Sequence, residues 1–429
     1  MRPAGNCASS WWNWGMSEFP TQRLDEFIAD GSVLLGRGDV ISKDDIEAHP
    51  GPYPIYSSSA HNNGKFGEYG KFMFDEELIT WSVDGGGYFF YRPKHKYSVT
   101  NVCGYMRLRG EKLHPKFVYY SLVNQHRYLT FDYTSKAHPS VIKKQYWLPT
   151  IAREQQQKIA AILTCVDTSI EKTEALIAKY QQIKAGLMHD LFTRGVTADG
   201  KLRPPREQAP ELYQETPIGW IPKEWEVAEL KSEIGIAHGF AFSGEYFSDT
   251  PPGEVLLTPG NFHRDGGLYF TVENTKYFQG PIPPATVLPN GEMVTVMTDL
   301  SPQTLILGRF AIVETPFFLL HNQRIGRVML KRKDRWDWSY LCYALNDERV
   351  RRKIIVEATG TTVRHTSPLR ILGNRVARPH LEEQRRSIEV IRSIERRLVE
   401  EQASLLKSKQ EKLGLMTDLL TGQVRVKGS

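Results

Sequence analysis

The sequence predicts an α+β fold made by tandem duplication. Two globular α/β domains are each followed by a long helix, and the helices are expected to separate the domains as an antiparallel coiled coil with pseudo-two-fold symmetry. Three observations predict this fold. One segment carries a long apolar row at helical spacing, a related segment closes the chain, and the residues before the two segments also resemble each other.

The first long helix is predicted over residues 151–196, after Pro149. Positions alternately four and three apart form a row that we call the helix seam, and only Thr173 and Lys184 interrupt its apolar and aromatic side chains. The row consists of Ile159, Leu163, Val166, Ile170, Thr173, Ile177, Tyr180, Lys184, Leu187 and Leu191. A helix of this length extends for roughly 50 Å between the ends of the row, so it needs a partner along its whole apolar side.

The partner is predicted in the same chain, over residues 381–426. This segment begins EQRRSI from Glu383, where the first has EQQQKI from Glu154, and it ends with GLMTDLL where the first has GLMHDLF. Its seam is less regular and consists of Ile388, Ile391, Glu395, Leu398, Gln402, Leu405, Lys409, Leu413, Met416 and Leu420. Gly186 and Gly414 match within the two helices, which indicates either a close approach of another helix or subunit, or a fraying helix end.

The globular domains are predicted at 19–150 and 218–380, joined through a linker at 197–217 that is rich in proline and charge. Residues 1–18 form a leader outside the first domain and are expected to be disordered. Short aromatic or apolar runs between glycine-rich turns predict strands at 72–74, 78–83, 88–91 and 102–108, a helix at 117–124, and second-domain strands at 254–257, 293–298 and 310–314.

Local similarity links the two domains. SVTNVCGYMRL, from Ser98, aligns with FLLHNQRIGRVML, from Phe318, and KFVYYSL, from Lys116, aligns with DWSYLCYAL, from Asp337. A segment rich in Ser, Thr, His and basic residues then precedes each helix, at 134–144 and 359–370. Two related but unequal domains in one chain are typical of a pseudo-dimer, which would recognise a split, asymmetric target.

Composition indicates a globular protein with a modest excess of basic residues. Net charge is +6, the isoelectric point is about 8.9 and the hydrophobic content is 40%, which is compatible with nucleic-acid binding without requiring it. The four cysteines are far apart and form no CxxC pair, so we expect free, buried thiols in a reducing, cytoplasmic setting. No run of eighteen apolar residues and no secretory signal is present.

These features together resemble the specificity subunit of type I restriction–modification enzymes, over about residues 19–426. The resemblance is strongest in LPTIAREQQQKIAAIL and IEKTEALIAKYQQIKAGLMHDLFTRGV, which are similar to the central repeat region of that family. IGWIPKEWEVAEL, from Ile218, is similar to the start of the family's second target-recognition domain, and SVTNVCGYMRL and PHLEEQ also fit. The second helix departs more, with RRS where the family usually has lysine and small residues.

The resemblance implies that each globular domain is a target-recognition domain for one half of a bipartite DNA site. The helices would set the spacing, with half-sites roughly one duplex turn apart, about 10 base pairs, and would dock two modification (methyltransferase) subunits. S-adenosylmethionine, ATP and magnesium are then expected in the modification and restriction subunits, and no cofactor or metal is expected in this chain.

The sequence lacks the motifs of the enzyme classes that a DNA-modifying chain would need. TPPG at 250–253 and IPPA at 282–285 lack the aromatic residue of an adenine methyltransferase loop, and LLGRGD at 34–39 and DGGG at 84–87 do not fit a glycine-rich cofactor loop. No GxxxxGK[ST] is present, and the adjacent carboxylates at 75–77 suit a solvated turn better than a metal site. The isolated chain is therefore expected to catalyse nothing.

DNA contact requires cations for phosphates and amide or planar groups for base edges. First-domain candidates are Asn62, Asn63, Lys65, Lys136, Lys143 and Lys144, with Lys71, Arg92, Lys94 and Lys96 as further cations. Second-domain candidates are Arg264, Arg324, Arg327, Arg364 and His365, with Arg309 as a further cation. Two alternatives stay open: a coiled-coil scaffold whose end domains bind protein or RNA, and a fused modification enzyme, which the missing loop argues against.

Overall fold

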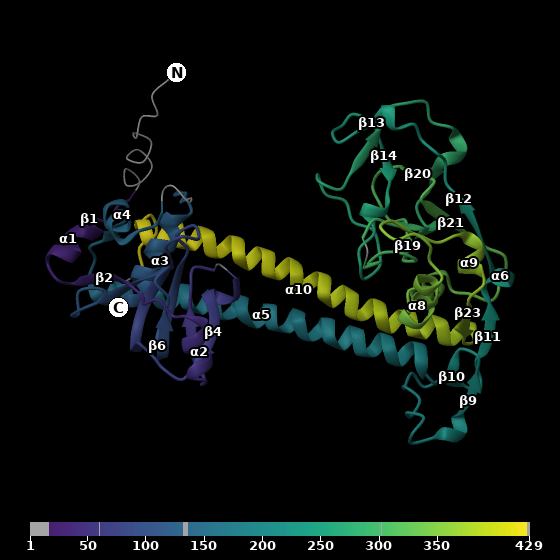
Figure 1. The fold of residues 1–429 in the computed structure, drawn as a ribbon, viewed down its shortest axis with the longest axis horizontal. Helices are drawn as coiled ribbons and strands as arrows, with labels where there is room; N and C mark the ends of the chain where they lie inside the picture. The colour runs from purple at the N-terminus through teal and green to yellow at the C-terminus, as the bar shows by residue number, and fades with distance from the viewer. Residues whose placement is uncertain (1–16, 60, 132–135, 302, 427–429) are drawn as a thin grey trace. The chain divides into compact units, whose positions relative to one another are not determined.

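The computed structural model describes residues 17–426 except 60, 132–135 and 302 (Figure 1), so nearly all of the leader predicted at 1–18 lies outside the described residues. The chain forms two compact units, unit 1 up to Ile177 and again from Glu400, and unit 2 from Ala178 to Val399. Both long helices, α5 (Arg153–Thr193) and α10 (Leu381–Thr421), contribute residues to each unit. The division therefore falls within the helices and not at the linker.

Unit 1 contains a six-stranded sheet in the order β2-β7-β5-β6-β3-β4, in which only β3 and β6 are parallel. The elements before α5 are β1 (Thr21–Arg23), α1 (Leu24–Ala29), β2 (Val33–Arg37), α2 (Lys43–Ala48), β3 (Tyr53–Tyr56), η1 (His61–Gly64), β4 (Lys65–Tyr69), β5 (Phe74–Ser82), β6 (Phe89–Val99), β7 (Cys103–Leu108), α3 (Pro115–His126), α4 (Pro139–Gln145) and β8 (Trp147–Pro149).

Unit 2 contains a four-stranded sheet, β12-β21-β17-β19, and a five-stranded sheet, β13-β15-β14-β20-β16. The elements before α10 are η2 (Pro210–Leu212), β9 (Tyr213–Thr216), β10 (Gly219–Pro222), β11 (Glu226–Glu229), α6 (Leu230–Glu233), β12 (Ile234–His238), η3 (Gly244–Tyr246), β13 (Phe247–Ser248), β14 (Glu254–Leu257), η4 (Pro259–Asn261), β15 (Lys276–Phe278), η5 (Pro284–Thr286), β16 (Val287–Leu288), β17 (Met293–Val296), β18 (Thr298–Asp299), β19 (Phe310–Ile312), β20 (Leu319–His321), β21 (Ile325–Leu330), α7 (Trp338–Leu345), α8 (Glu348–Val356), β22 (Arg364–His365), α9 (Pro368–Leu372) and β23 (Arg375–Arg378).

Part of the strand order is the same in the two domains. The order β2-β7-β5-β6 in the first domain corresponds to β12-β21-β17-β19 in the second. The distal part of the long strand β6 pairs in parallel with β3, as β20 pairs in parallel with β14, so β6 corresponds to β19 and β20 together. The sheet order thus repeats the similarity that the two halves show in sequence.

A glycine follows β2 in the first domain and β12 in the second, and each allows two backbone segments of its own domain to approach closely. A Cβ at Gly38 would overlap the carbonyl oxygen of Val99, and a Cβ at Gly239 would overlap that of Asn322. The LLGRGD segment that contains Gly38 is therefore a site of close backbone packing, which any side chain would disturb.

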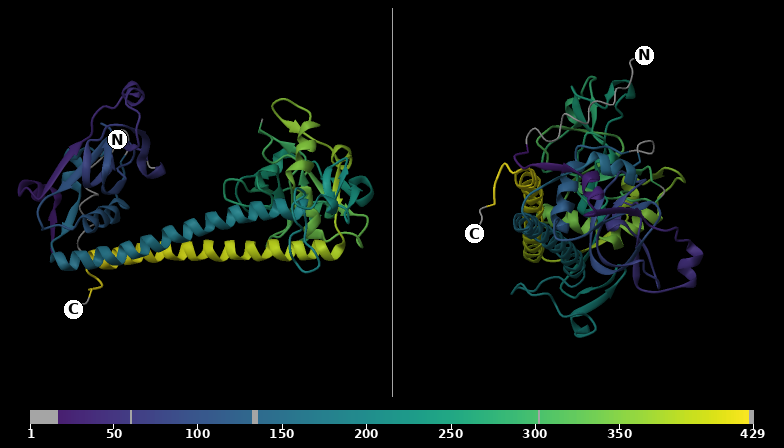
Figure 2. Two further views of the ribbon diagram at one scale, coloured as in Figure 1. Left: turned by 90° about the horizontal axis from the view of Figure 1, so that it is seen from below. Right: turned by 90° about the vertical axis from the view of Figure 1, so that its left-hand side faces the viewer.

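The two long helices pack antiparallel within each unit (Figure 2). In unit 1 Lys412 and Lys409 of α10 pair with Asp167 and Glu174 of α5, and in unit 2 Glu395 of α10 pairs with Lys184 of α5. The residue number falls along one helix as it rises along the other, which is the antiparallel sense. Most seam residues of the first helix are buried or half-buried.

The seam predicted for α10 is wrong at three of its later positions, whereas Met416 and Leu420 are buried as predicted. Leu413 is 42% exposed, and Gln402 and Lys409 are also exposed, whereas Lys412 points to α5 and bonds Asp167. Lys412, and not Leu413, has the place in α10 that Lys184 has in α5. When α5 and α10 are matched from their first residues to their last, Glu383 corresponds to Gln155, one residue beyond the Glu154 to which the sequence comparison aligns it.

A buried glutamine near the start of each helix confirms this register. In unit 1 the Gln156 side chain accepts a hydrogen bond from the His114 backbone N–H (2.8 Å) and donates to the Lys112 and Ile151 carbonyls. In unit 2 the Gln384 side chain accepts from the Asp337 N–H (2.9 Å) and donates to the Arg335 and Pro379 carbonyls. Each glutamine thus ties the start of its long helix to the start of α3 or α7.

The linker is structured and anchored by a buried ion pair. Arg203 bonds both carboxylate oxygens of Glu383, and the same carboxylate accepts hydrogen bonds from the Val196 N–H (3.0 Å) and the Trp225 indole (3.2 Å). Glu383 is 4% exposed and Arg203 5%. The end of α5, the linker and the start of α10 therefore meet at one charged centre in unit 2.

Three smaller expectations need correction. Cys165 is exposed on α5, whereas Cys103 and Cys342 are buried, which raises the pKa of each of these two thiols to about 12. The carboxylates at 75–77 lie on strand β5 and not in a turn, and Glu76 pairs with Arg107 at 2.6 Å. A Cβ at Gly186 or Gly414 would meet nothing within 4 Å, so no other part of the described chain approaches them closely.

Buried histidines predict a loss of stability in acid. His321 is 6% exposed, its Nε2 lies 2.9 Å from the Ile325 carbonyl, and burial lowers its pKa from the ordinary 6.5. The unfolded chain then binds more protons below pH 6.5, so the free energy of unfolding should fall as the pH falls through that value. Urea denaturation at pH 7.5 and 5.5 measures the change.

His321→Gln should reduce this pH dependence. Some dependence will persist in His321→Gln, since burial also lowers the pKa of His126. Equal pH dependence in wild type and His321→Gln would contradict the assignment.

Candidate nucleic-acid interface

The first candidate surface is a polar turn in the first domain. Asn62 and Asn63 are exposed and adopt left-handed backbone angles, with φ of 49° and 52°, and Gly64 follows with φ of 74°. Asparagine tolerates this conformation better than most residues do. Both amides therefore extend from a tight turn, where they are able to meet base edges.

Arg92 lies beneath this turn and is not available for phosphate contact. It is 1% exposed, its Nε donates to Thr80 Oγ1 at 3.0 Å, and its guanidinium carbon lies 3.6 Å from the centre of the Tyr56 ring. One terminal nitrogen lies 3.1 Å from the position that a Cβ would take at Gly64. Burial also lowers the pKa of Arg92. Its side chain packs between the Tyr56 ring and the turn at Gly64.

The first-domain lysines differ in their surroundings. Lys65 pairs with Glu68 at 2.6 Å and Lys136 with Asp84 at 3.0 Å, and both lysines are exposed. Lys143 and Lys144 occupy the last turn of α4, half-buried and exposed respectively. Among the further cations, Lys71 pairs with Asp45, and Lys96 lies over the Tyr53 and Phe72 rings.

Corresponding surfaces lie at the carboxyl end of β5 in the first domain and of β17 in the second. We call each of them the recognition edge. In the first domain it comprises the turn at 83–88 and residues 136–138, joined by a hydrogen bond from the Ala137 N–H to the Val83 carbonyl (3.0 Å). In the second it comprises β18, the following loop and β22, with Thr298 opposite His365 and Asp299 opposite Arg364.

The structure brings three second-domain candidates to this edge. Arg364 and His365 lie on β22. Arg324 lies next to the start of β18, since its carbonyl accepts a hydrogen bond from the Met297 N–H (3.0 Å), and its side chain is exposed. The Arg364 guanidinium donates to the Gly360 and Ile355 carbonyls, which fixes its direction.

The other second-domain candidates lie elsewhere. Arg264 belongs to an exposed turn at 263–267, and Arg327 is held by two hydrogen bonds to the Glu292 carboxylate (3.1 and 2.6 Å), which raise its pKa. Arg309 is 8% exposed and pairs with Glu348 at 2.8 Å. Arg309 and Arg327 are therefore structural cations in this conformation.

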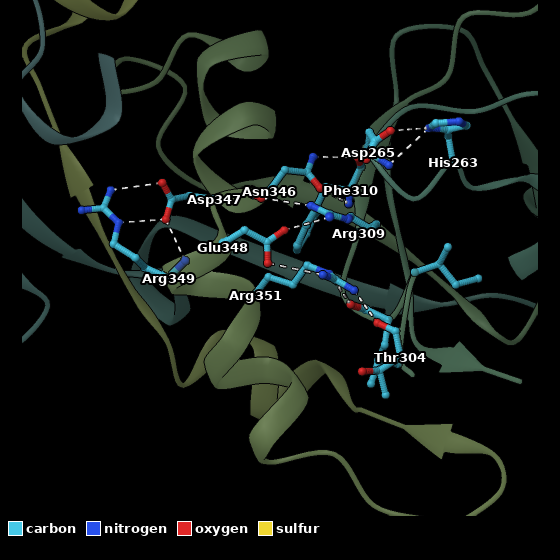
Figure 3. A network of polar contacts seen from close by, with 12 residues as sticks. His263, Asp265, Thr304, Arg309, Phe310, Asn346, Asp347, Glu348, Arg349 and Arg351 are labelled. Atoms are coloured by element: carbon cyan, nitrogen blue, oxygen red, sulfur yellow. Dashed lines mark hydrogen bonds and ion pairs between the residues drawn. The ribbon is translucent and has the colours of Figure 1, made fainter. Parts of the chain in front are cut away.

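Sequence reasoning missed the loop that completes the second edge (Figure 3). The Asp299 carboxylate accepts hydrogen bonds from the backbone N–H groups of Ile306 (2.8 Å) and Leu307 (3.1 Å). Arg351 donates to the Thr304 and Leu307 carbonyls and contacts Glu348. These contacts hold Leu300 and Leu305 exposed at the surface, 60% and 48% respectively. Bonds from an arginine to backbone carbonyls so distant in the sequence leave no local signal that sequence reasoning could have found.

Within the described residues, no group of three or more His, Cys, Asp or Glu side chains is placed to hold a metal ion. Across the same part of the chain, no helix combines the length and apolarity that a membrane span requires.

Comparison with known proteins gives one consistent family. Residues 25–182 match the family model described as type I restriction modification DNA specificity domain. The chain is 25% identical over 420 residues to a type I restriction enzyme specificity subunit of Methanocaldococcus jannaschii, covering 94% of this chain and 92% of that protein. It is 40% identical over 90 residues to the N-terminus of a putative type I specificity subunit of Mycoplasma pneumoniae, covering 20% of this chain and 48% of the relative.

Solved structures show the same fold. The crystal structure of a type I restriction–modification S subunit from M. genitalium aligns over 98% of each chain with a TM-score of 0.57 at 14% identity. A second structure, from work on complex assembly of the type I system, aligns over 95% of this chain and 98% of that chain with a TM-score of 0.53 at 13% identity. The family model, the relatives and these folds agree, and the proteins that this chain is similar to are specificity subunits of type I restriction–modification systems.

Proposed function

We propose that this chain selects a bipartite, asymmetric DNA site, with one half-site read by each globular domain. The duplicated recognition edge carries the proposal, since both domains present it at the end of the same central strand. The side chains at the two edges differ, Lys136 in one domain and Arg324, Arg364 and His365 in the other, so the half-sites are expected to differ.

We propose further that α5 and α10 set the spacing between the half-sites and dock two modification subunits. An exposed apolar row at seven-residue spacing on α10, formed by Val399, Leu406 and Leu413, supports the docking role. S-adenosylmethionine, ATP and magnesium would then act in the modification and restriction subunits, and this chain would supply specificity without catalysis.

The test is duplex binding by the chain assembled with its modification subunits. Binding should be steeply dependent on salt and should prefer one split sequence over shuffled duplexes of equal length. Equal affinity for all duplexes would overturn the proposal, and preference for RNA or for a protein would favour a scaffold instead.

Lys143 and Lys144 allow a sharper test of phosphate contact. Neutralising both with Lys143→Gln and Lys144→Gln should weaken binding to all duplexes alike. Each phosphate contact contributes about 0.9 to the slope of log affinity against log salt, so the slope should become shallower by roughly 1.8 if both contact phosphate. A matched control is Lys112→Gln with Lys409→Gln, which removes two lysines already paired with Asp30 and Glu174. An equal change of slope in the control would count against contact by Lys143 and Lys144.

A further inference from the structure

A tyrosine, a carboxylate and a lysine meet where the first domain contacts the long helices. The Tyr120 hydroxyl of α3 donates to Asp167 of α5 at 2.7 Å, and Lys412 of α10 pairs with the same carboxylate at 2.5 Å. Tyr120 is 3% exposed. Burial and then the hydrogen bond to Asp167 raise its pKa, so the phenol stays protonated and donates. One carboxylate thus joins the domain to both helices.

The same arrangement recurs in unit 2 with the helices exchanged. The Tyr343 hydroxyl of α7 donates to Glu395 of α10 at 2.6 Å, and Lys184 of α5 pairs with that carboxylate at 2.8 Å. Burial and the bond to Glu395 raise the pKa of Tyr343. Lys184 and Glu395 are among the polar residues that interrupt the two apolar rows in the sequence.

Sequence positions show that these are duplicated copies. Counted from the first residue of each long helix, Asp167 has the same place in α5 as Glu395 in α10, and Lys184 has the same place as Lys412. Tyr120 and Tyr343 likewise occupy the same place counted from the first residues of α3 and α7. The backbone groups that donate to the two buried glutamines belong to the N-cap residues of these same two helices. We call each set of tyrosine, carboxylate and lysine a junction triad.

A junction triad is suited to fixing the position of a domain helix along the two long helices. Its carboxylate is two-thirds or more buried and is satisfied only when the domain helix and both long helices are in register. A slip of one helical turn, about 5.4 Å, would leave a buried phenol and a carboxylate unpaired. Unpaired buried polar groups cost free energy, so the slipped arrangement is disfavoured. Apolar side chains on either side would accept the slip more readily, since their packing is non-directional.

We infer that the two junction triads are positioning elements that fix each recognition domain on its helix pair and thereby restrict the DNA spacer to one length. The inference rests on the proposed function and adds residues that determine the spacing and not the bases. Removing the hydroxyl groups should therefore leave both half-site sequences unchanged and relax the spacer.

The experiment is methylated-base sequencing of DNA from cells that express the modification subunit with wild type or with the Tyr120→Phe, Tyr343→Phe double variant. Wild type should give one spacer length. The double variant should give the same half-sites with spacers one base pair longer and shorter as well, because losing hydrogen bonds to charged groups lowers the preference for one geometry roughly tenfold. Lys184→Met with Lys412→Met should relax the spacer in the same direction.

Tyr69→Phe is the matched control, since it removes a buried hydroxyl that bonds Ser98 (2.9 Å) inside the first domain. It should retain one spacer even where methylation is reduced. A single spacer in both triad variants, with methylation reduced as in Tyr69→Phe, would show that the triads only stabilise the fold and would overturn the inference. Wild type without any split motif would overturn the proposed function itself, and the inference with it.

Discussion

Replacing Glu383 by alanine is expected to lower the free energy of unfolding by about 3–5 kcal/mol. The substitution removes the acceptor for three groups at the joint of α5, the linker and α10: the Arg203 guanidinium, the Val196 N–H and the Trp225 indole. Arg203 would then be a buried cation that keeps only the exposed Glu224 as an acidic partner. Such losses are far larger than those at surface ion pairs.

The neighbouring glutamate provides the control. Glu382 is exposed and pairs with Arg385 at 2.7 Å, so Glu382→Ala should change the free energy of unfolding by less than about 0.5 kcal/mol. Glu383→Gln, which retains an oxygen acceptor, should fall between the two. Urea denaturation of the purified chain measures all three. Equal midpoints for Glu383→Ala and Glu382→Ala would contradict the assigned role of the buried pair.

Alanine at Gly38 or Gly239 is expected to destabilise its domain by about 1–3 kcal/mol or more, because the added methyl group overlaps a backbone carbonyl that only a shift of the chain relieves. Alanine at Gly186 should have the opposite effect. It lies within α5 with open space around its Cβ position, so the exchange should stabilise the chain by up to about 1 kcal/mol.

Thermal unfolding of the three alanine variants separates the two effects, since the chemical change is the same and only the surroundings differ. The midpoint should fall for Gly38→Ala and Gly239→Ala and rise for Gly186→Ala. A fall of similar size for all three would mean that close packing at the two domain glycines is not the cause.

The sequence predicted the long helices and the duplication well, because heptad spacing and repeated segments are local signals. It failed on the register at the start of the two helices. Glu154 is followed by three glutamines, and nothing local shows that Gln156, and not Gln155, takes the buried place that Gln384 takes in the second copy. Near the other end of α10, the apolar Leu413 was predicted at the interface, where Lys412, one residue earlier, bonds Asp167.

The candidate interface was predicted less well than the fold. The sequence does not distinguish an exposed arginine, such as Arg324, from one that pairs with a carboxylate, as Arg327 pairs with Glu292. Arg92 illustrates the same limit, because its burial depends on the turn at 61–64 folding over strand β6. The recognition edge joins segments that are far apart in sequence, and only the sheet brings them together.

The central claim is that this chain chooses the DNA sequence. Methylated-base sequencing of DNA from cells that express the modification subunit, with and without this chain, tests it most directly. We expect methyladenine in both halves of one split, asymmetric motif when the chain is present, and no such motif in its absence. The same motif in both samples would contradict the claim, since sequence choice would then lie in the modification subunit.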